Sequence, residues 1–131
     1  MASIFSKIVA GEIPCHKIAE TDNCFAFLDV FPLVKGHVLV IPKKEVDYLF
    51  DLDEKLYCEL QLFAKNIAKA ISETIPCKRV GVAVIGLEVT QAHIQLVPLN
   101  QIGDINFSHE KLKPSKQELE ETAALIRSAL N

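Results

Sequence analysis

One short stretch of the sequence, QAHIQ at positions 91–95, places polar side chains at every second residue. Successive side chains of an extended strand point to opposite faces, so Gln91, His93 and Gln95 would lie on the same face. A neutral imidazole is a good nucleophile near pH 7, and an unperturbed histidine has a pKa of about 6.5. His93 is therefore a candidate nucleophile, flanked by two amides that can donate and accept hydrogen bonds.

A second histidine, His37, follows Gly36 and opens the apolar run HVLVIP. Two neutral imidazoles in one site would supply a nucleophile and a second hydrogen-bond donor. Other interpretations remain open. The polar positions of 91–95 are compatible with a solvated strand face, and His37 with a strand-edge residue bonded to a backbone carbonyl. A metal site formed by His37, His93 and Glu88 is a further alternative, although the three show no recognisable ligand spacing.

A long amphipathic helix is predicted over residues 53–74. Apolar residues recur there at steps of three and four, which places them on one helical face. Asp51 followed by Glu54 is typical of an N-terminal capping box, with a start displaced by two residues as the alternative, and Pro76 marks the end of the helix.

Two shorter helices and five strands complete the predicted elements. The stretch SIFSKIVAG predicts a short helix that ends near Gly11, and Ser115 with Glu118 predicts a capping box for a final helix over 115–130. Connections between neighbouring strands are short, whereas parallel neighbours need a crossover of about a dozen residues or more. The sequence therefore predicts an α+β fold with a five-stranded antiparallel sheet. The predicted strands cover residues 16–21, 24–30, 37–42, 79–86 and 91–99.

Composition limits the classes of protein to consider. With 131 residues, of which 50% are hydrophobic, the chain is predicted to form one domain over residues 1–131. The formal net charge is −3 and the lysines are spread along the chain, which argues against a nucleic-acid partner. No apolar run approaches about 20 residues, so no membrane span is expected. Four irregularly spaced cysteines and the lack of a signal-peptide pattern favour a reduced, cytoplasmic protein.

Three blocks of the sequence resemble the histidine triad (HIT) family of nucleotide hydrolases and transferases. They read SIFSKIVAGEIP, FAFLDVFPLVKGHVLVIPKK and EVTQAHIQLVP, and together they extend over residues 3–98. The family's defining motif is His-φ-His-φ-His-φ-φ, in which φ is apolar, and the corresponding residues here are QAHIQLV. The middle histidine is retained, whereas glutamine stands in both flanking positions. The resemblance implies a HIT-like fold, with one long central helix, a short N-terminal helix and a C-terminal helix beside the sheet.

The resemblance also implies roles for individual residues. His93 matches the nucleophile that attacks the α-phosphate of a purine nucleotide, AMP-like or a dinucleotide, and forms a covalent nucleotidyl-histidine. His37 matches an upstream histidine near the site, and Asp29 matches the aspartate that holds the ribose hydroxyls. Gln91 and Gln95 occupy the flanking triad positions. The Gln95 amide can donate hydrogen bonds to phosphate but cannot transfer a proton, so we expect phosphoramidate hydrolysis to be weakened more than phosphoanhydride cleavage.

Apolar positions and one loop complete the predicted nucleotide site. Phe5, Ile8 and Ile13 match apolar residues around the base, and plain core packing is the alternative role for each. The backbone of the loop at Gly86 and Glu88 could approach a phosphate, although the Glu88 carboxylate would repel it. The asparagine that many family members carry in this loop has no counterpart here.

The resemblance bears on cofactors, partners and activity as well. Many bacterial members bind zinc at positions that here read Ser3, Ser6 and Glu45, which form a poor zinc site, so neither a metal nor another cofactor is expected. A homodimer is implied by the family. An enzyme is the favoured interpretation, and a catalytically weakened nucleotide-binding or sensing module is the alternative. A purely structural dimer is a third.

Overall fold

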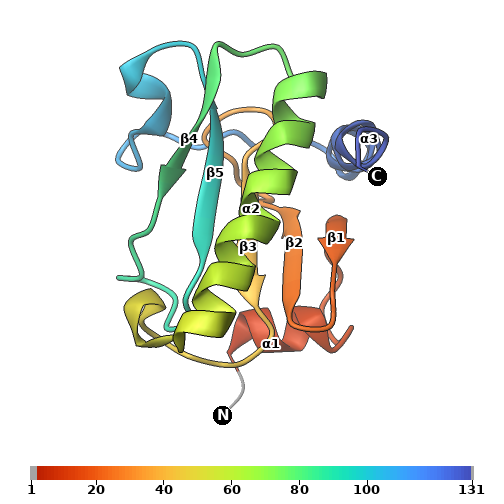
Figure 1. Ribbon diagram of the computed structural model, residues 1–131. Coiled ribbons are helices and arrows are strands. Elements are labelled where there is room, and N and C mark those ends of the chain that lie inside the picture. The colour runs from red at the N-terminus through yellow and green to blue at the C-terminus, as the bar shows by residue number, and fades with distance from the viewer. Residues whose placement is uncertain (1–2, 131) are drawn as a thin grey trace.

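A computed structural model describes residues 3–130 as one antiparallel sheet with three α-helices (Figure 1). The five strands are β1 (Lys17–Glu20), β2 (Cys24–Leu28), β3 (Val38–Pro42), β4 (Arg79–Ala83) and β5 (Ile94–Leu99), in the spatial order β1-β2-β3-β5-β4. The helices are α1 (Ile4–Val9), α2 (Glu54–Thr74) and α3 (Lys116–Arg127), with 3-10 turns η1 (Leu49–Asp51) and η2 (Ile102–Ile105). The predicted α+β class, the five-stranded antiparallel sheet and the three helices are confirmed.

Helix α2 crosses one face of the sheet (Figure 1). Its capping residue differs from the predicted one. The N-cap is Asp53, whose side chain accepts a hydrogen bond of 2.8 Å from the backbone N–H of Leu56. Asp51 is not the N-cap, because it is part of η1 and its N–H is bonded to Tyr48, and the helix starts two residues later, as the alternative allowed. Asp53 has the extended backbone that an N-cap requires, with φ −64° and ψ 158°.

The two faces of the central strands β2, β3 and β5 pack into different cores. Alternate residues face α2 and meet its apolar side, where Leu60, Ile67 and Ile71 are fully buried. Each such side chain contributes roughly 1.5–3 kcal/mol of burial free energy. The intervening residues face α1 and the loops around it, in a smaller cluster. That cluster consists of Phe5, Ile8, Phe25, Phe27, Leu39 and Ile41.

Strand β5 begins later than predicted. The two strands expected over 79–86 and 91–99 end at Ala83 and begin at Ile94, so residues 84–93 form an irregular connection that carries His93. The β3–β5 ladder stops at Val40 paired with Ile94. Further along β3, Pro42 has no backbone N–H to donate. The Gln91 side chain bonds the Pro42 carbonyl instead, at 3.1 Å.

The sheet edges are β1 and β4. The β1 edge is joined to α3 by Arg127, whose guanidinium donates a 2.6 Å hydrogen bond to the carbonyl of Lys17. The β4 edge carries exposed apolar side chains, and Val82 is 61% exposed. Between residues 3 and 130, none of the helices has the length and apolarity needed to span a bilayer.

Candidate active site

A cavity of about 550 Å³, which we call the His93 cavity, lies on the sheet face that carries the smaller apolar cluster. Its walls come from α1, the chain before β1, strands β2, β3 and β5, the 85–89 loop and the segment after η2. Eight of the ten predicted site residues line it: Phe5, Ile8, Ile13, Asp29, Gly86, Glu88, His93 and Gln95. The other two, Gln91 and His37, are fully buried behind them. Phe5 and Ile8 belong to the buried cluster, Ile13 packs against it, and all three line the cavity, so their positions are compatible with both roles considered for them.

His93 is held in one tautomer when its ring is neutral. Its Nδ1 lies 2.7 Å from the backbone oxygen of Gln91, and because a carbonyl can only accept, Nδ1 carries the proton. The lone pair is therefore on Nε2. Every fully buried side-chain nitrogen or oxygen among residues 3–130 has a hydrogen-bond partner, and Nε2 has none, so this atom reaches open space. The Phe5 ring packs edge-to-face against one side of the imidazole, with 5.1 Å between the two ring centroids.

The predicted alternative of a solvated strand face is wrong. Gln91 is 0% exposed, and His93 and Gln95 are each 7% exposed. Their alternate neighbours Ala92 and Ile94 pack into the core under α2, as the two-residue spacing implies.

His37 determines how the Gln95 amide is turned. The backbone N–H of Leu33 donates to His37 Nδ1 at 3.1 Å, so a neutral His37 carries its proton on Nε2. That Nε2–H donates to Gln95 Oε1 at 2.8 Å. The Gln95 carbonyl oxygen thus faces His37, and its NH₂ group is turned toward the cavity, where it can donate to a ligand. His37 is not bonded to a backbone carbonyl, contrary to the alternative interpretation.

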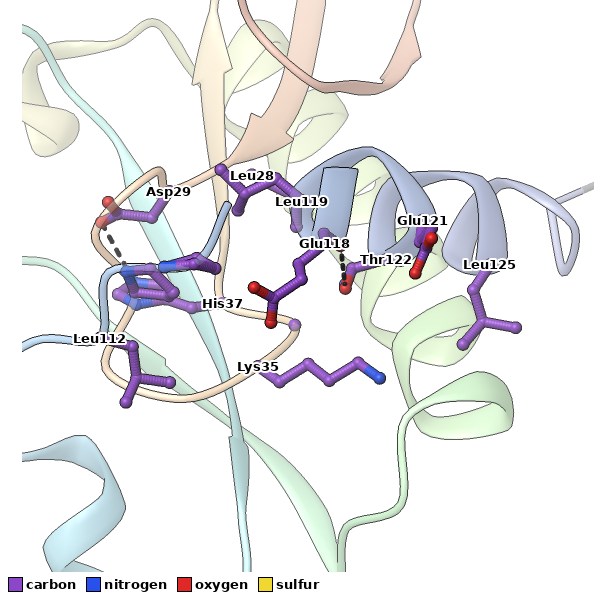
Figure 2. A pocket seen from close by; sticks show the side chains of 13 residues that line it. Leu28, Asp29, Lys35, His37, Leu112, Glu118, Leu119, Glu121, Thr122 and Leu125 are labelled. Atoms are coloured by element: carbon purple, nitrogen blue, oxygen red, sulfur yellow. Dashed lines mark hydrogen bonds and ion pairs between the residues drawn. The ribbon is translucent and has the colours of Figure 1, made fainter. Parts of the chain in front are cut away.

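Burial keeps His37 neutral. It lowers the pKa of His37, and the positive charge of Lys111 and the neighbouring His93 lower it further, while Asp29 and the bond to Gln95 act in the opposite direction. The Asp29 carboxylate is 3.9 Å from His37 Nε2 (Figure 2). Because both nitrogens of His37 already have hydrogen-bond partners, the metal site proposed from His37, His93 and Glu88 does not fit this arrangement.

The loop between β2 and β3 brings Asp29 and His37 together. The N–H of Asp29 donates to the His37 carbonyl at 3.0 Å, and its Oδ1 accepts from the N–H of Phe31 at 2.9 Å. Gly36 precedes His37 with φ +93°, and a Cβ there would lie 3.0 Å from a side-chain carbon of Ile75. The turn into His37 therefore requires glycine.

Comparison with known proteins assigns the family. Residues 10–102 match the HIT domain. The chain belongs to the HIT family. An uncharacterised HIT-like protein of Mycoplasma genitalium is 35% identical over 133 residues, which cover 98% of this chain and 94% of that protein. The crystal structure of a HIT-like protein from Bartonella henselae has a TM-score of 0.83 and 31% identity, over 98% of this chain and 96% of that one.

The HIT family includes nucleotide hydrolases. An adenosine 5'-monophosphoramidase of Saccharomyces cerevisiae is 36% identical over 98 residues, which cover 74% of this chain and 62% of that enzyme. The family and the fold inferred from residues 3–98 are thus confirmed.

Gln91 joins three parts of the molecule. Its Oε1 accepts hydrogen bonds from the hydroxyls of Ser3 and Ser6, and its Nε2 donates to Pro42. Ser3 is also the N-cap of α1, and its N–H donates to Glu45, which lowers the pKa of that carboxyl. Gln91 therefore anchors α1 and the end of β3 to the connection that carries His93.

Two residues that line the His93 cavity lie beyond the predicted motif. Phe107 and Lys111 belong to the irregular segment after η2 and close one side of the His93 cavity. The Phe107 ring lies edge-to-face with His37 at 6.0 Å. The N–H of Leu112 donates to the Pro32 carbonyl at 2.9 Å and fastens the segment to the β2–β3 loop. No periodicity or motif in the sequence signals this placement.

A second cavity of about 460 Å³ lies between the β2–β3 loop and α3, with Lys35 and Glu118 pointing into it (Figure 2). It shares Asp29 with the His93 cavity. Its one histidine among the described residues, His37, has both nitrogens bonded, and the hydroxyl of Thr122 donates to the carbonyl of Glu118. Since its histidine and its hydroxyl are both engaged in hydrogen bonds, whereas His93 keeps an unbonded ring nitrogen, the His93 cavity is the candidate active site of this HIT protein.

Proposed function

We propose that this protein is a nucleotide hydrolase or nucleotidyl transferase that acts at the α-phosphate of a purine nucleotide through a covalent nucleotidyl-His93. One observation carries the proposal: the 2.7 Å bond from Nδ1 to the Gln91 carbonyl leaves the Nε2 lone pair free at a cavity. The cavity volume of about 550 Å³ lies within the roughly 300–1,000 Å³ common for small-molecule sites.

The reaction would proceed in two steps. The Nε2 lone pair attacks the α-phosphorus, a P–N bond forms, and the bond to the leaving group breaks with its electrons going to that group. Positive charge then develops on the ring, and the Nδ1–H bond to the Gln91 carbonyl stabilises it. Water or another acceptor next attacks phosphorus and loses a proton to solvent, and the P–N electrons return to Nε2. The Gln95 NH₂ group donates to a phosphate oxygen in both steps.

The remainder of the cavity suits a nucleoside. Phe5, Ile8 and Ile13 form an apolar region for the base, together with Phe27 of β2. The Asp29 carboxylate is the acceptor for the ribose hydroxyls, and its position is set by the hydrogen bond from Phe31.

The leaving group should depart as an anion. An amine must be protonated as it leaves, but Gln95 has no acidic proton and the Nε2–H of His37 is already donated to Gln95. Phosphoanhydrides should therefore be cleaved better than phosphoramidates. Gln95→His should raise phosphoramidate turnover more than phosphoanhydride turnover, and steady-state kinetics with both substrate classes would check this. An equal gain on both would contradict it.

The covalent intermediate provides the decisive test. Intact-mass spectrometry of the wild type mixed with an adenylyl or guanylyl substrate should show a protein carrying one nucleotidyl group. His93→Ala should show none, whereas His109→Ala should label like the wild type, because His109 is exposed and outside the cavity. Labelling of His93→Ala at the wild-type level would remove His93 from the mechanism.

A nucleotide-binding or sensing module is the second candidate function. It is favoured by the glutamines at both flanking positions, one of which, Gln91, is fully buried and does not line the cavity. Tight binding of AMP by the wild type, without turnover of any adenylyl or guanylyl substrate, would support the module against the enzyme.

We also propose a homodimer that forms through the β4 edges of two copies. The support is an open sheet edge with the exposed apolar residues Val82, Val84 and Ile85 beside it. Antiparallel pairing of β4 with itself gives the two-fold symmetry usual for dimers, and it covers an edge otherwise prone to aggregation. Light scattering coupled to gel filtration should show a dimer for the wild type and a monomer for Val82→Lys. A monomeric wild type would refute the dimer.

A further inference from the structure

The charges around the His93 cavity would not by themselves attract a nucleotide. Two carboxylates, Asp29 and Glu88, line it, and Lys111 is the one lysine or arginine among the lining residues that the structure describes. A phosphate group brought near two carboxylates is repelled unless a cation lies close by. The position of Lys111 therefore decides whether the cavity can hold a phosphate chain.

Lys111 lines the cavity, and the backbone next to it is anchored to the loop that carries two residues of the proposed site. The residue after it, Leu112, is hydrogen-bonded through its N–H to Pro32 in the loop that carries Asp29 and His37. Its positive charge contributes to lowering the pKa of His37, so it lies within electrostatic range of that ring. His37 is in turn 2.8 Å from Gln95, whose NH₂ group faces the cavity.

The Lys111 ammonium is also available to a ligand. Within residues 3–130, no Asp or Glu oxygen lies within 4.0 Å of it, whereas Lys17 and Lys43 are both paired with Glu20. Lys113, two residues further along, lines neither cavity.

We propose that Lys111 binds the phosphate chain of the nucleotide, and that the preferred substrates are those whose leaving group is itself a phosphate, such as nucleoside diphosphates. The inference rests on the proposed function and deepens it. An ammonium can neutralise the charge that a departing phosphate carries, which Gln95 cannot do by proton transfer. The site thus draws its cation from the segment after η2, outside the residues that resemble the HIT motif.

The test compares three ligands that are not turned over at the α-phosphate: adenosine, AMP and the α,β-methylene analogue of ADP. Isothermal titration would measure their affinities for the wild type, Lys111→Gln, Lys111→Arg and the control Lys113→Gln. Lys111→Gln should lower the affinity for the ADP analogue by about 10-fold or more, equivalent to about 1.4 kcal/mol, and leave the affinity for adenosine unchanged. Lys111→Arg should retain most of the affinity, and Lys113→Gln should match the wild type for all three ligands.

The dependence on salt supplies a second readout. The affinity ratio of wild type to Lys111→Gln for the ADP analogue should shrink as NaCl rises from about 0.05 M to about 0.5 M, because salt screens an exposed charge. An unchanged affinity of Lys111→Gln for the ADP analogue would overturn the inference, as would an equal loss for adenosine, which would assign Lys111 to wall packing. If the wild type binds none of the three ligands, the nucleotide site itself is refuted, and the role of Lys111 with it.

Discussion

The two faces of the central strands share one backbone, but one face packs into the core under α2 and the other borders the His93 cavity. Toward α2, Ile94 and Leu96 pack among aliphatic side chains that leave no polar atom to satisfy. Toward α1, the alternate residues of the same stretch are His93 and Gln95, and they border a cavity. A helix of 21 residues covers the first face, whereas the 6-residue α1 covers part of the second. Alternation along one stretch of chain can therefore place the residues that stabilise the core on one face and the candidate catalytic residues on the other.

The polar face is stable because its groups bond one another. Burying an unbonded amide or imidazole costs about 1–3 kcal/mol in mutational data. Here His37 bonds both Leu33 and Gln95, and Gln91 bonds Pro42 and two serines of the N-terminal region. No fully buried side-chain nitrogen or oxygen in residues 3–130 lacks a partner. The same bonds that offset burial also orient the groups that face the cavity.

The sharpest test of the comparison is His93→Ala. Turnover of an adenylyl substrate should fall by about 10⁴-fold or more, in line with the loss of a covalent nucleophile. The unfolding free energy should fall by only about 1 kcal/mol, because the bond to the Gln91 carbonyl is lost but the side chain borders a cavity and not the core under α2. Steady-state kinetics and calorimetry on the same preparation would check both. A variant that fails to fold would make His93 a structural residue, and both faces of the sheet would then serve stability.

The matched change on the opposite face is Ile94→Ala, one residue away. Ile94 is 1% exposed beneath α2, so its truncation should cost about 2–5 kcal/mol of unfolding free energy in urea titrations. The activity per folded molecule, measured at a temperature where the variant is folded, should stay near the wild-type value. A specific loss of turnover without a loss of stability would show that the α2 face also shapes the site.

How much of this arrangement follows from sequence depends on which contacts create it. The α2 helix and the strand faces could be predicted because burial imposes a period of 3.6 or 2 on apolar residues. The helix start could not, since Asp51 and Asp53 are chemically identical caps, and the turn formed by η1 selects between them. The late start of β5 depends on Pro42, which lies in another strand.

Most residues that line the candidate site could be predicted, but the orientation of their side chains could not. His93 and Gln95 could be identified from spacing and family resemblance. The direction of the Gln95 amide depends on His37, 58 residues earlier, whose tautomer depends on the backbone of Leu33. Lys111 lies in an irregular segment without apolar period, where nothing local in the sequence indicates contact with the cavity.

Replacing His37 tests whether the polar face depends on a neutral imidazole. His37→Gln should lower the free energy of unfolding by about 1–3 kcal/mol at pH 7, because the Leu33 N–H and the Gln95 carbonyl lose their present partner. The pH dependence should change as well. Burial lowers the folded-state pKa of His37, so below about pH 6.5 the unfolded chain binds the additional proton and wild-type stability falls with falling pH.

Urea unfolding between about pH 7.5 and pH 5 would measure this loss. The unfolding free energy of His37→Gln should depend less on pH than that of the wild type over that window. Asp29, Lys111 and His93 face the ring, and the attraction of Asp29 reduces the effect without reversing it. Carboxyls with lowered pKa, such as Glu45 and Glu120, act at lower pH, since their stabilisation is lost only as the pH falls through their own pKa values. Parallel pH profiles for the two proteins would contradict the role assigned to His37.

The smallest expected effects distinguish two helix caps that are equivalent locally. Ser3 caps α1 and Ser115 caps α3, each by accepting a backbone N–H, so replacing either with alanine should cost about 0.5–2 kcal/mol. Ser3 also donates to Gln91, which anchors the connection carrying His93, whereas the described bonds of Ser115 stay within α3. Ser3→Ala should therefore lower kcat as well as stability, and Ser115→Ala should lower stability alone. Equal kcat values in the two variants would mean that Gln91 keeps its position without the serine, and that the polar face tolerates the loss of a single bond.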